Sequence, residues 1–127
     1  NTDWREVVTS SGSGGVTAES VTFDEEKYKI TTATVDSLSG TQTVDSFSTN
    51  DYTVAKYIVK ASDSTSITCS ELLLVCTASG VEMTQYGVLG NTSLVSFDAD
   101  VASSVASLSA TTDQTNVDLS IYKFLLG

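Results

Sequence analysis

Few residues in this chain could do chemistry, and the residue types that are missing narrow the possibilities further. The 127 residues include no histidine, which removes the usual general base, the Ser-His-Asp arrangement and the commonest zinc ligand. The string "SIYK", from Ser120 to Lys123, matches the S-x-x-K pattern of serine acyl-enzymes. Three positions along a strand place Ser120 and Lys123 on opposite faces, so we interpret the match as chance. We therefore expect no enzyme activity, no catalytic residue and no cofactor.

Asp98 and Asp100 are the strongest candidates for a metal site. They lie two residues apart in "LVSFDADV", so on a strand their carboxylates share a face about 6 to 7 Å apart. Oxygen ligands of this kind suit calcium. The alternative is that both carboxylates are simply solvated, and a glycosidase pair is disfavoured because it needs one buried carboxyl.

Composition favours strands and excludes several classes of partner. Serine and threonine supply 39 residues and proline is absent, which fits an all-β protein. The net charge of −10 repels phosphate backbones and anionic lipids, so nucleic acid is not an expected partner. The longest apolar run, residues 72–76, is too short to cross a bilayer. Because the chain begins at Asn1 rather than Met, we expect a processed protein or a fragment.

The order of segments predicts an arm followed by one domain. Residues 1–15 contain Trp4 and the Ser/Gly-rich stretch "TSSGSGG", and we interpret them as an N-terminal arm and linker. From residue 16 to residue 127, polar and apolar residues alternate with period two, as in "YTVAKYIVKAS" and "VDLSIYKFLLG". About seven to nine strands result, which predicts a single antiparallel, jelly-roll-like β-sandwich. The segment "DADVASSVASLSA" could also form a short helix.

One expected strand breaks the alternation. Residues 72–75 are all apolar in "ITCSELLLVCTAS", so this strand is either central in its sheet or covered on its second face by a loop or a neighbouring subunit. We take Leu72 and Leu74, together with Trp4 of the arm, as interface candidates. Cys69 and Cys76 lie in the same strand, face opposite sides and are too far apart to pair, so we expect two buried free thiols.

Short colinear segments resemble a known family. They are "VDSF" at residues 44–47, "AKY" at 55–57, "SELLLV" at 70–75, "YG" at 86–87, and "SL" followed by "FDAD" at 93–100. In this order they resemble a β-rich domain of virion structural proteins of marine tailed bacteriophages, particularly cyanophages. The resemblance covers roughly residues 41–127, whereas residues 1–40 match nothing in that family.

The resemblance implies a virion location and a non-enzymatic role in the tail, neck, fibre or head decoration. The expected partners are copies of the chain and other virion proteins, with no membrane insertion. The alternative is a carbohydrate-binding host-attachment adhesin that uses exposed aromatic residues, or Asp98 and Asp100 with calcium, to hold a host surface glycan.

Overall fold

The protein is an all-β sandwich in the part of the chain that the structure covers. The structure is a computed structural model that describes residues 27–90 and 94–127. These residues form eight strands and one short 3-10 turn, η1. In chain order the elements are β1 Tyr28–Val35, η1 Ser37–Ser39, β2 Gln42–Ser48, β3 Val54–Ser62, β4 Ile67–Thr77, β5 Gly80–Gly90, β6 Ser96–Ala102, β7 Val105–Thr111 and β8 Val117–Leu126. The predicted fold class and strand number are confirmed.

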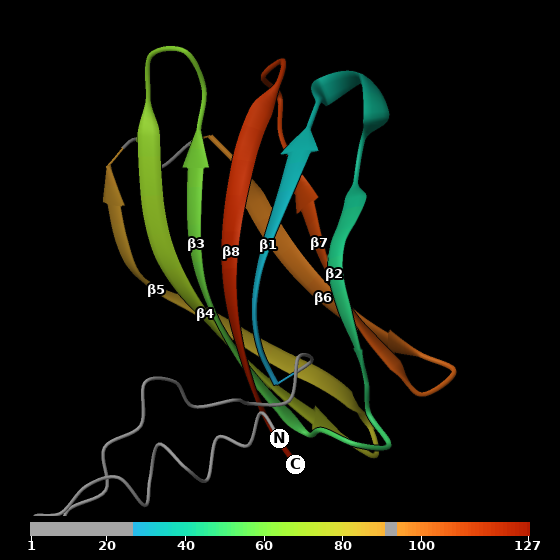
Figure 1. Cartoon of the computed structure of the whole chain (residues 1–127). Helices are drawn as coiled ribbons and strands as arrows, with labels where there is room; N and C mark the ends of the chain where they lie inside the picture. The colour runs from blue at the N-terminus through green and yellow to red at the C-terminus, as the bar shows by residue number, and fades with distance from the viewer. Residues whose placement is uncertain (1–26, 91–93) are drawn as a thin grey trace, which may run out of the picture.

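Two antiparallel sheets face each other (Figure 1). The first has five strands in the order β1-β8-β3-β4-β5, and the second has three in the order β2-β7-β6. The first strands of the chain pair with the last ones, as in a jelly roll: β1 pairs with β8, and β2 pairs with β7. The strands β3, β4 and β5 depart from that scheme, since they follow one another as a meander within one sheet.

The core lies between the sheets and follows from the period-two patterns. Along β8, Val117, Leu119 and Ile121 are buried while the residues between them are exposed, as the alternation predicts. Facing them across the interior are Phe47 of β2 and Leu108 of β7. Each strand thus buries one face against the other sheet, which is what holds a sandwich together.

Short polar turns join the strands. Between β3 and β4, the Asp63 carboxylate accepts hydrogen bonds of 2.8 Å from the backbone N–H groups of Thr65 and Ser66, and these bonds lower the pKa of Asp63. Between β6 and β7, Ser103 and Ser104 both have positive φ, as a type I′ hairpin turn requires. The helix considered for this segment is therefore not formed, because its alternating apolar residues bury one face of a hairpin instead.

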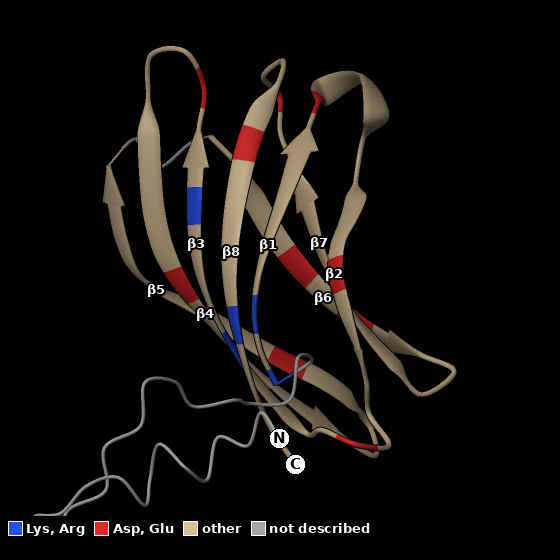
Figure 2. Ribbon diagram, viewed as in Figure 1, with Lys and Arg blue, Asp and Glu red and all other residues tan. Residues whose placement is uncertain are grey.

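Charge is divided unevenly between the two sheets. In Figure 2 the blue segments lie on or just before strands of the five-stranded sheet, β1, β3 and β8. Acidic residues lie on both sheets, with Glu71, Glu82 and Asp118 on the five-stranded sheet and Asp45, Asp98 and Asp100 on the three-stranded one. Within residues 27–90 and 94–127, no helix is long and apolar enough to cross a membrane.

The two cysteines are free and lie on opposite faces of β4. Their separation is as predicted, but both are half-buried rather than buried. Cys76 packs against the core, and desolvation raises the pKa of its thiol. The predicted arm, residues 1–15, lies outside the described residues, as does the start of the predicted domain over residues 16–127.

Candidate functional site

The outward side of the five-stranded sheet gathers apolar and aromatic side chains into a continuous surface. Strand register places them in two rows that run across the sheet. One row contains Ile30, Tyr122, Ile58, Glu71 and Tyr86. The next contains Tyr28, Phe124, Lys56, Leu73 and Thr84. We call the apolar members on β1, β8, β3 and β4 the aromatic face, namely Tyr28, Ile30, Ile58, Leu73, Tyr122 and Phe124.

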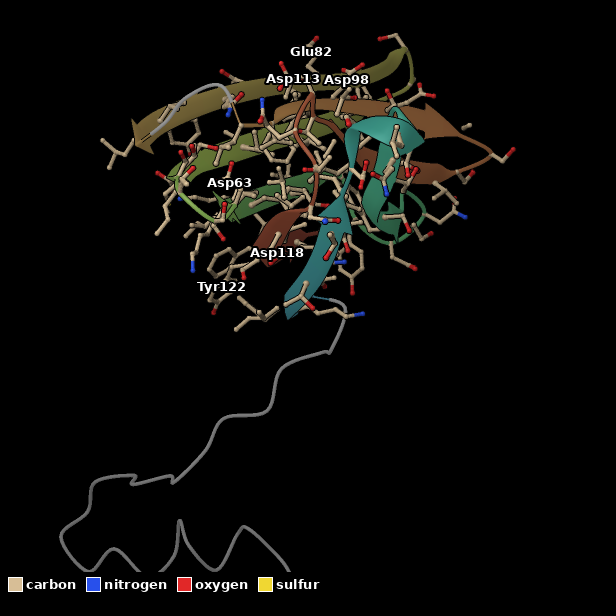
Figure 3. The ribbon with its side chains drawn as sticks, turned by 90° about the horizontal axis from the view of Figure 1, so that it is seen from above. Asp63, Glu82, Asp98, Asp113, Asp118 and Tyr122 are labelled. Atoms are coloured by element: carbon tan, nitrogen blue, oxygen red, sulfur yellow. The ribbon has the colours of Figure 1, made fainter. Side chains whose placement is uncertain are left out.

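Three rings form the part of this face that lies over β1 and β8. Tyr122 and Phe124 are two residues apart on β8, and their rings stack with centroids 4.5 Å apart and planes 10° from parallel. Tyr28 meets the edge of Phe124 at 5.6 Å and 88°. Both geometries are favoured by aromatic quadrupoles. In Figure 3, Tyr122 projects from the side of the sandwich opposite Asp98, so the cluster faces outward.

The aromatic face is distinguished by exposed apolar residues that adjoin one another. Ile30 is 70% exposed, and Ile58, Leu73 and Tyr122 are each more than a third exposed. Single exposed apolar residues are ordinary, but a contiguous group on one sheet marks an interaction surface.

A single ion pair interrupts the apolar rows. Lys56 Nζ lies 3.0 Å from Glu71 Oε1, and the hydrogen bond and charge of Glu71 raise the pKa of Lys56. Both side chains reach solvent, so the pair adds little stability and is screened by salt. The pair leaves this part of the aromatic face without net charge, because the Lys56 ammonium balances the Glu71 carboxylate.

The interface residues predicted on β4 face the wrong way for this role. Leu72 and Leu74 are fully buried between the two sheets, whereas Leu73 and Val75 are exposed. Leu74 lies opposite Ala55, and Leu72 opposite Tyr57, and all of these point into the core. Within the apolar run 72–75, the residues that a partner can reach are therefore Leu73 and Val75. Trp4, the third predicted interface residue, lies outside the described residues.

Asp98 and Asp100 lie where the alternation of β6 predicts, exposed on the outward side of the three-stranded sheet. The Asp98 carboxylate accepts a hydrogen bond of 2.9 Å from the backbone N–H of Ala99. Among residues 27–90 and 94–127, no three His, Cys, Asp or Glu side chains gather into a group that could hold a metal ion. The geometry therefore adds no third carboxylate to the predicted calcium site.

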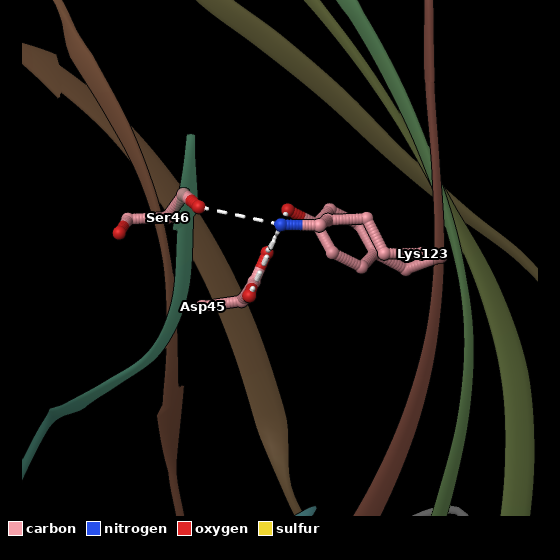
Figure 4. Close-up of polar contacts among 4 residues, drawn as sticks. Asp45, Ser46 and Lys123 are labelled. Atoms are coloured by element: carbon pink, nitrogen blue, oxygen red, sulfur yellow. Dashed lines mark hydrogen bonds and ion pairs between the residues drawn. The ribbon is translucent and has the colours of Figure 1, made fainter. Parts of the chain in front are cut away.

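Sequence reasoning missed a buried polar cluster that joins the two sheets. Lys123 of β8 is 1% exposed, and its Nζ lies 3.1 Å from Oδ2 of Asp45 on β2, a carboxylate that is 8% exposed (Figure 4). The hydroxyl of Tyr57, on β3, donates a hydrogen bond of 2.8 Å to the same oxygen. Nζ also donates to the backbone carbonyl of Ser46 at 3.4 Å.

The signal for this cluster was present in β8. Lys123 continues the inward series of Val117, Leu119 and Ile121, and a buried lysine requires a partner. Asp45 reaches the interior because the pairing of β2 with β7 shifts register between Thr43 and Asp45, as at a β-bulge. Burial and the nearby Asp45 charge raise the pKa of Tyr57, so its hydroxyl stays a donor.

Comparisons with known proteins include a distant structural likeness. No protein-family model matches the chain, and no curated protein sequence matches it. Among solved structures it is similar to the tailspike protein of Acinetobacter phage vB_ApiP_P1, with a TM-score of 0.47 and 17% sequence identity. The likeness covers 90% of this chain but 24% of the tailspike, so the chain spans about a quarter of that protein. A likeness of this degree leaves the function to be argued from the residues themselves.

Proposed function

We propose that this protein is a non-enzymatic structural component of a bacteriophage virion, in its tail, neck, fibre or head decoration. It joins a repeated assembly by packing the aromatic face against the same face of a second copy. The observation that carries the proposal is the contiguous exposed apolar surface of the five-stranded sheet. The resemblance of residues 41–127 to phage virion domains supports the location.

Charge opposes self-association less at this face than over the chain as a whole. The chain carries a net charge of −10, so two copies repel each other in most orientations. The aromatic face is less acidic than the chain as a whole, because Lys56 balances Glu71 there and Lys60 lies one row further along β3. In a two-fold arrangement the same patch meets itself, so Lys56 of one copy can also approach Glu71 of the other.

The size of the face suits a dimer contact. A contact centred on the aromatic face would use the whole outward side of the sheet, where five strands spaced about 4.8 Å apart and about eight residues long give a surface of roughly 600 Å². Two such faces bury about 1,200 Å² in total, which is the lower end of the range for specific interfaces. Contacts of this size form reversibly in solution and are reinforced when many copies assemble.

Sedimentation velocity over a range of protein concentrations tests this function. Ile30→Lys places a charge on the most exposed residue of the aromatic face, and Leu38→Lys on η1 is the matched control, because Leu38 is 91% exposed and lies off the face. We expect the wild type and Leu38→Lys to associate and Ile30→Lys to stay monomeric. A wild type that remains monomeric at every concentration, or equal loss of association in both variants, contradicts the proposal.

The exposed rings favour a second candidate function, carbohydrate binding by a host-attachment adhesin. Sugar rings stack on flat aromatic side chains, and Tyr122 and Phe124 present parallel rings at a surface. A glycan array probed with wild type and Tyr122→Ala tests this alternative. Binding that Tyr122→Ala abolishes supports the adhesin, and the absence of binding to any glycan by the wild type removes it.

A further inference from the structure

The buried cluster of Asp45, Tyr57 and Lys123 brings an amine and a carboxyl together out of water. Lys123 Nζ contacts both carboxylate oxygens of Asp45, at 3.1 Å and 3.4 Å. Because Nζ contacts both oxygens, the carbon that joins them also lies close to the amine, and proximity of two reacting groups lowers the barrier to their reaction. The two side chains come from different sheets, and no loop connects them locally.

Reaction to a neutral product would remove two buried charges. A buried ion pair loses the hydration of both charges and regains it only in part. Transfer of one proton from the ammonium to the carboxylate gives a neutral amine and a neutral carboxylic acid, and neither carries that desolvation cost. A neutral amine is a nucleophile, and a neutral carboxylic acid is open to attack at its carbon.

We propose that Lys123 and Asp45 join through an intramolecular isopeptide bond. The lone pair of Nζ attacks Cγ of the protonated Asp45 carboxyl and forms the Nζ–Cγ bond. The tetrahedral intermediate loses a proton from nitrogen to the departing hydroxyl, the Cγ–O bond breaks, and one water leaves. The product is a neutral amide, and the step requires no oxidant, reductant or second substrate.

Two neighbours assist the reaction in distinct ways. The Tyr57 hydroxyl donates to Asp45 Oδ2 at 2.8 Å, and a donor on the carboxyl oxygen stabilises the negative charge that develops there during attack. The Ser46 carbonyl accepts from Nζ at 3.4 Å and holds the amine towards Asp45. Tyr57 is fully buried, so water does not compete for its hydroxyl.

The bond would join β8, the last strand in the chain, to β2, which lies in the other sheet. β8 and β2 would then be covalently joined across the core, and the chain between residues 45 and 123 would form a closed loop. A crosslink of this kind restricts the unfolded chain in the same way as a disulfide, and this chain has none among its described residues.

Intact-mass spectrometry of the full-length protein, denatured after purification, tests the proposal. We expect a mass lower than that of the sequence by one water. Trypsin should then leave a branched peptide that links residues 30–56 to residues 61–127, because the acylated Lys123 is no longer a cleavage site. A wild-type mass equal to that of the sequence, with both peptides linear, overturns the proposal.

Two variants locate the chemistry. Lys123→Arg retains the positive charge but not the amine, and we expect it to have the full mass of its sequence. If it still lacks one water, the loss arises elsewhere and the crosslink is refuted. Tyr57→Phe should leave a fraction of molecules without the bond when purified on the same schedule, and complete crosslinking in Tyr57→Phe would overturn the role given to the hydroxyl.

Discussion

Aspartate at two adjacent positions of β4 should have very different effects, because the two side chains lie on opposite faces. Leu74 is fully buried between the sheets, while Leu73 is 36% exposed on the aromatic face. The residues share the same strand, the same size and the same chemistry. Leu73→Asp and Leu74→Asp therefore form a matched pair in which only the direction of the side chain differs.

The structure sets the size of the difference. Leu74→Asp loses about 2 to 3 kcal/mol of apolar burial, and a buried carboxyl without a partner costs about 2 kcal/mol or more in addition. The total approaches the whole stability of a small domain, about 5 to 15 kcal/mol. Leu73→Asp loses about 1 kcal/mol, because part of the side chain is already in water and Lys56 lies directly across on β3.

Urea denaturation followed by circular dichroism measures both effects. We expect Leu73→Asp to unfold cooperatively at a slightly lower urea concentration than the wild type. Leu74→Asp should be unfolded, or nearly so, without denaturant. Sedimentation velocity should show that Leu73→Asp is folded but associates less than the wild type. Equal loss of stability in both variants would mean that both faces of β4 are core, and the aromatic face would not exist as a free surface.

Three further predictions concern the turns. Gly90→Ala should destabilise the protein by about 2 to 3 kcal/mol, because a Cβ at this positive φ meets the backbone of β4. Gly80→Ala has open space around the new Cβ and should cost about 1 kcal/mol. Equal melting temperatures of the two variants would contradict the close contact between Gly90 and β4. Replacing Ser103 with Asn and Ser104 with Gly should raise the free energy of unfolding by about 1 kcal/mol, because both positions have positive φ, which Asn and Gly adopt more readily than Ser. A urea midpoint lower than that of the wild type would argue against a type I′ turn. Asp63→Ala should be less stable than the wild type at neutral pH. Thermal melts should show this difference shrinking as pH falls through the lowered pKa of Asp63, because the hydrogen bonds that lower the pKa stabilise only the ionised carboxylate. A stability difference that grows in acid would contradict this role of Asp63.

The local parts of the fold could be predicted because they depend on neighbouring residues. The alternation in β8 identified which of its residues are buried, and the polar stretch between β3 and β4 identified a turn. The pairing of β1 with β8 and of β2 with β7 could not be predicted. Those contacts join segments far apart in the chain, and period-two patterns say which face is apolar but not which strand lies beside it.

The same limit explains the errors at the candidate site. Four consecutive apolar residues on β4 show that both faces are apolar without showing which face is covered, so the pattern alone does not separate Leu72 and Leu74 from Leu73 and Val75 as interface residues. The register with β3 shows that Leu72 and Leu74 face the core, because they lie opposite the buried residues Tyr57 and Ala55. The contact between Asp45 and Lys123 requires a β-bulge and the facing of two sheets, and neither can be read from a strand pattern alone.

Methyl NMR on a dilution series tests the central claim most directly, because it reports which surface changes when copies meet. With isoleucine, leucine and valine methyl groups labelled, the account predicts that shifts and line broadening grow with concentration at Ile30, Ile58 and Leu73. The methyl groups of Leu38 and Val105, exposed away from the aromatic face, should stay unchanged. Spectra that are independent of concentration, or equal changes at Leu38 and Val105, would contradict assembly through the aromatic face.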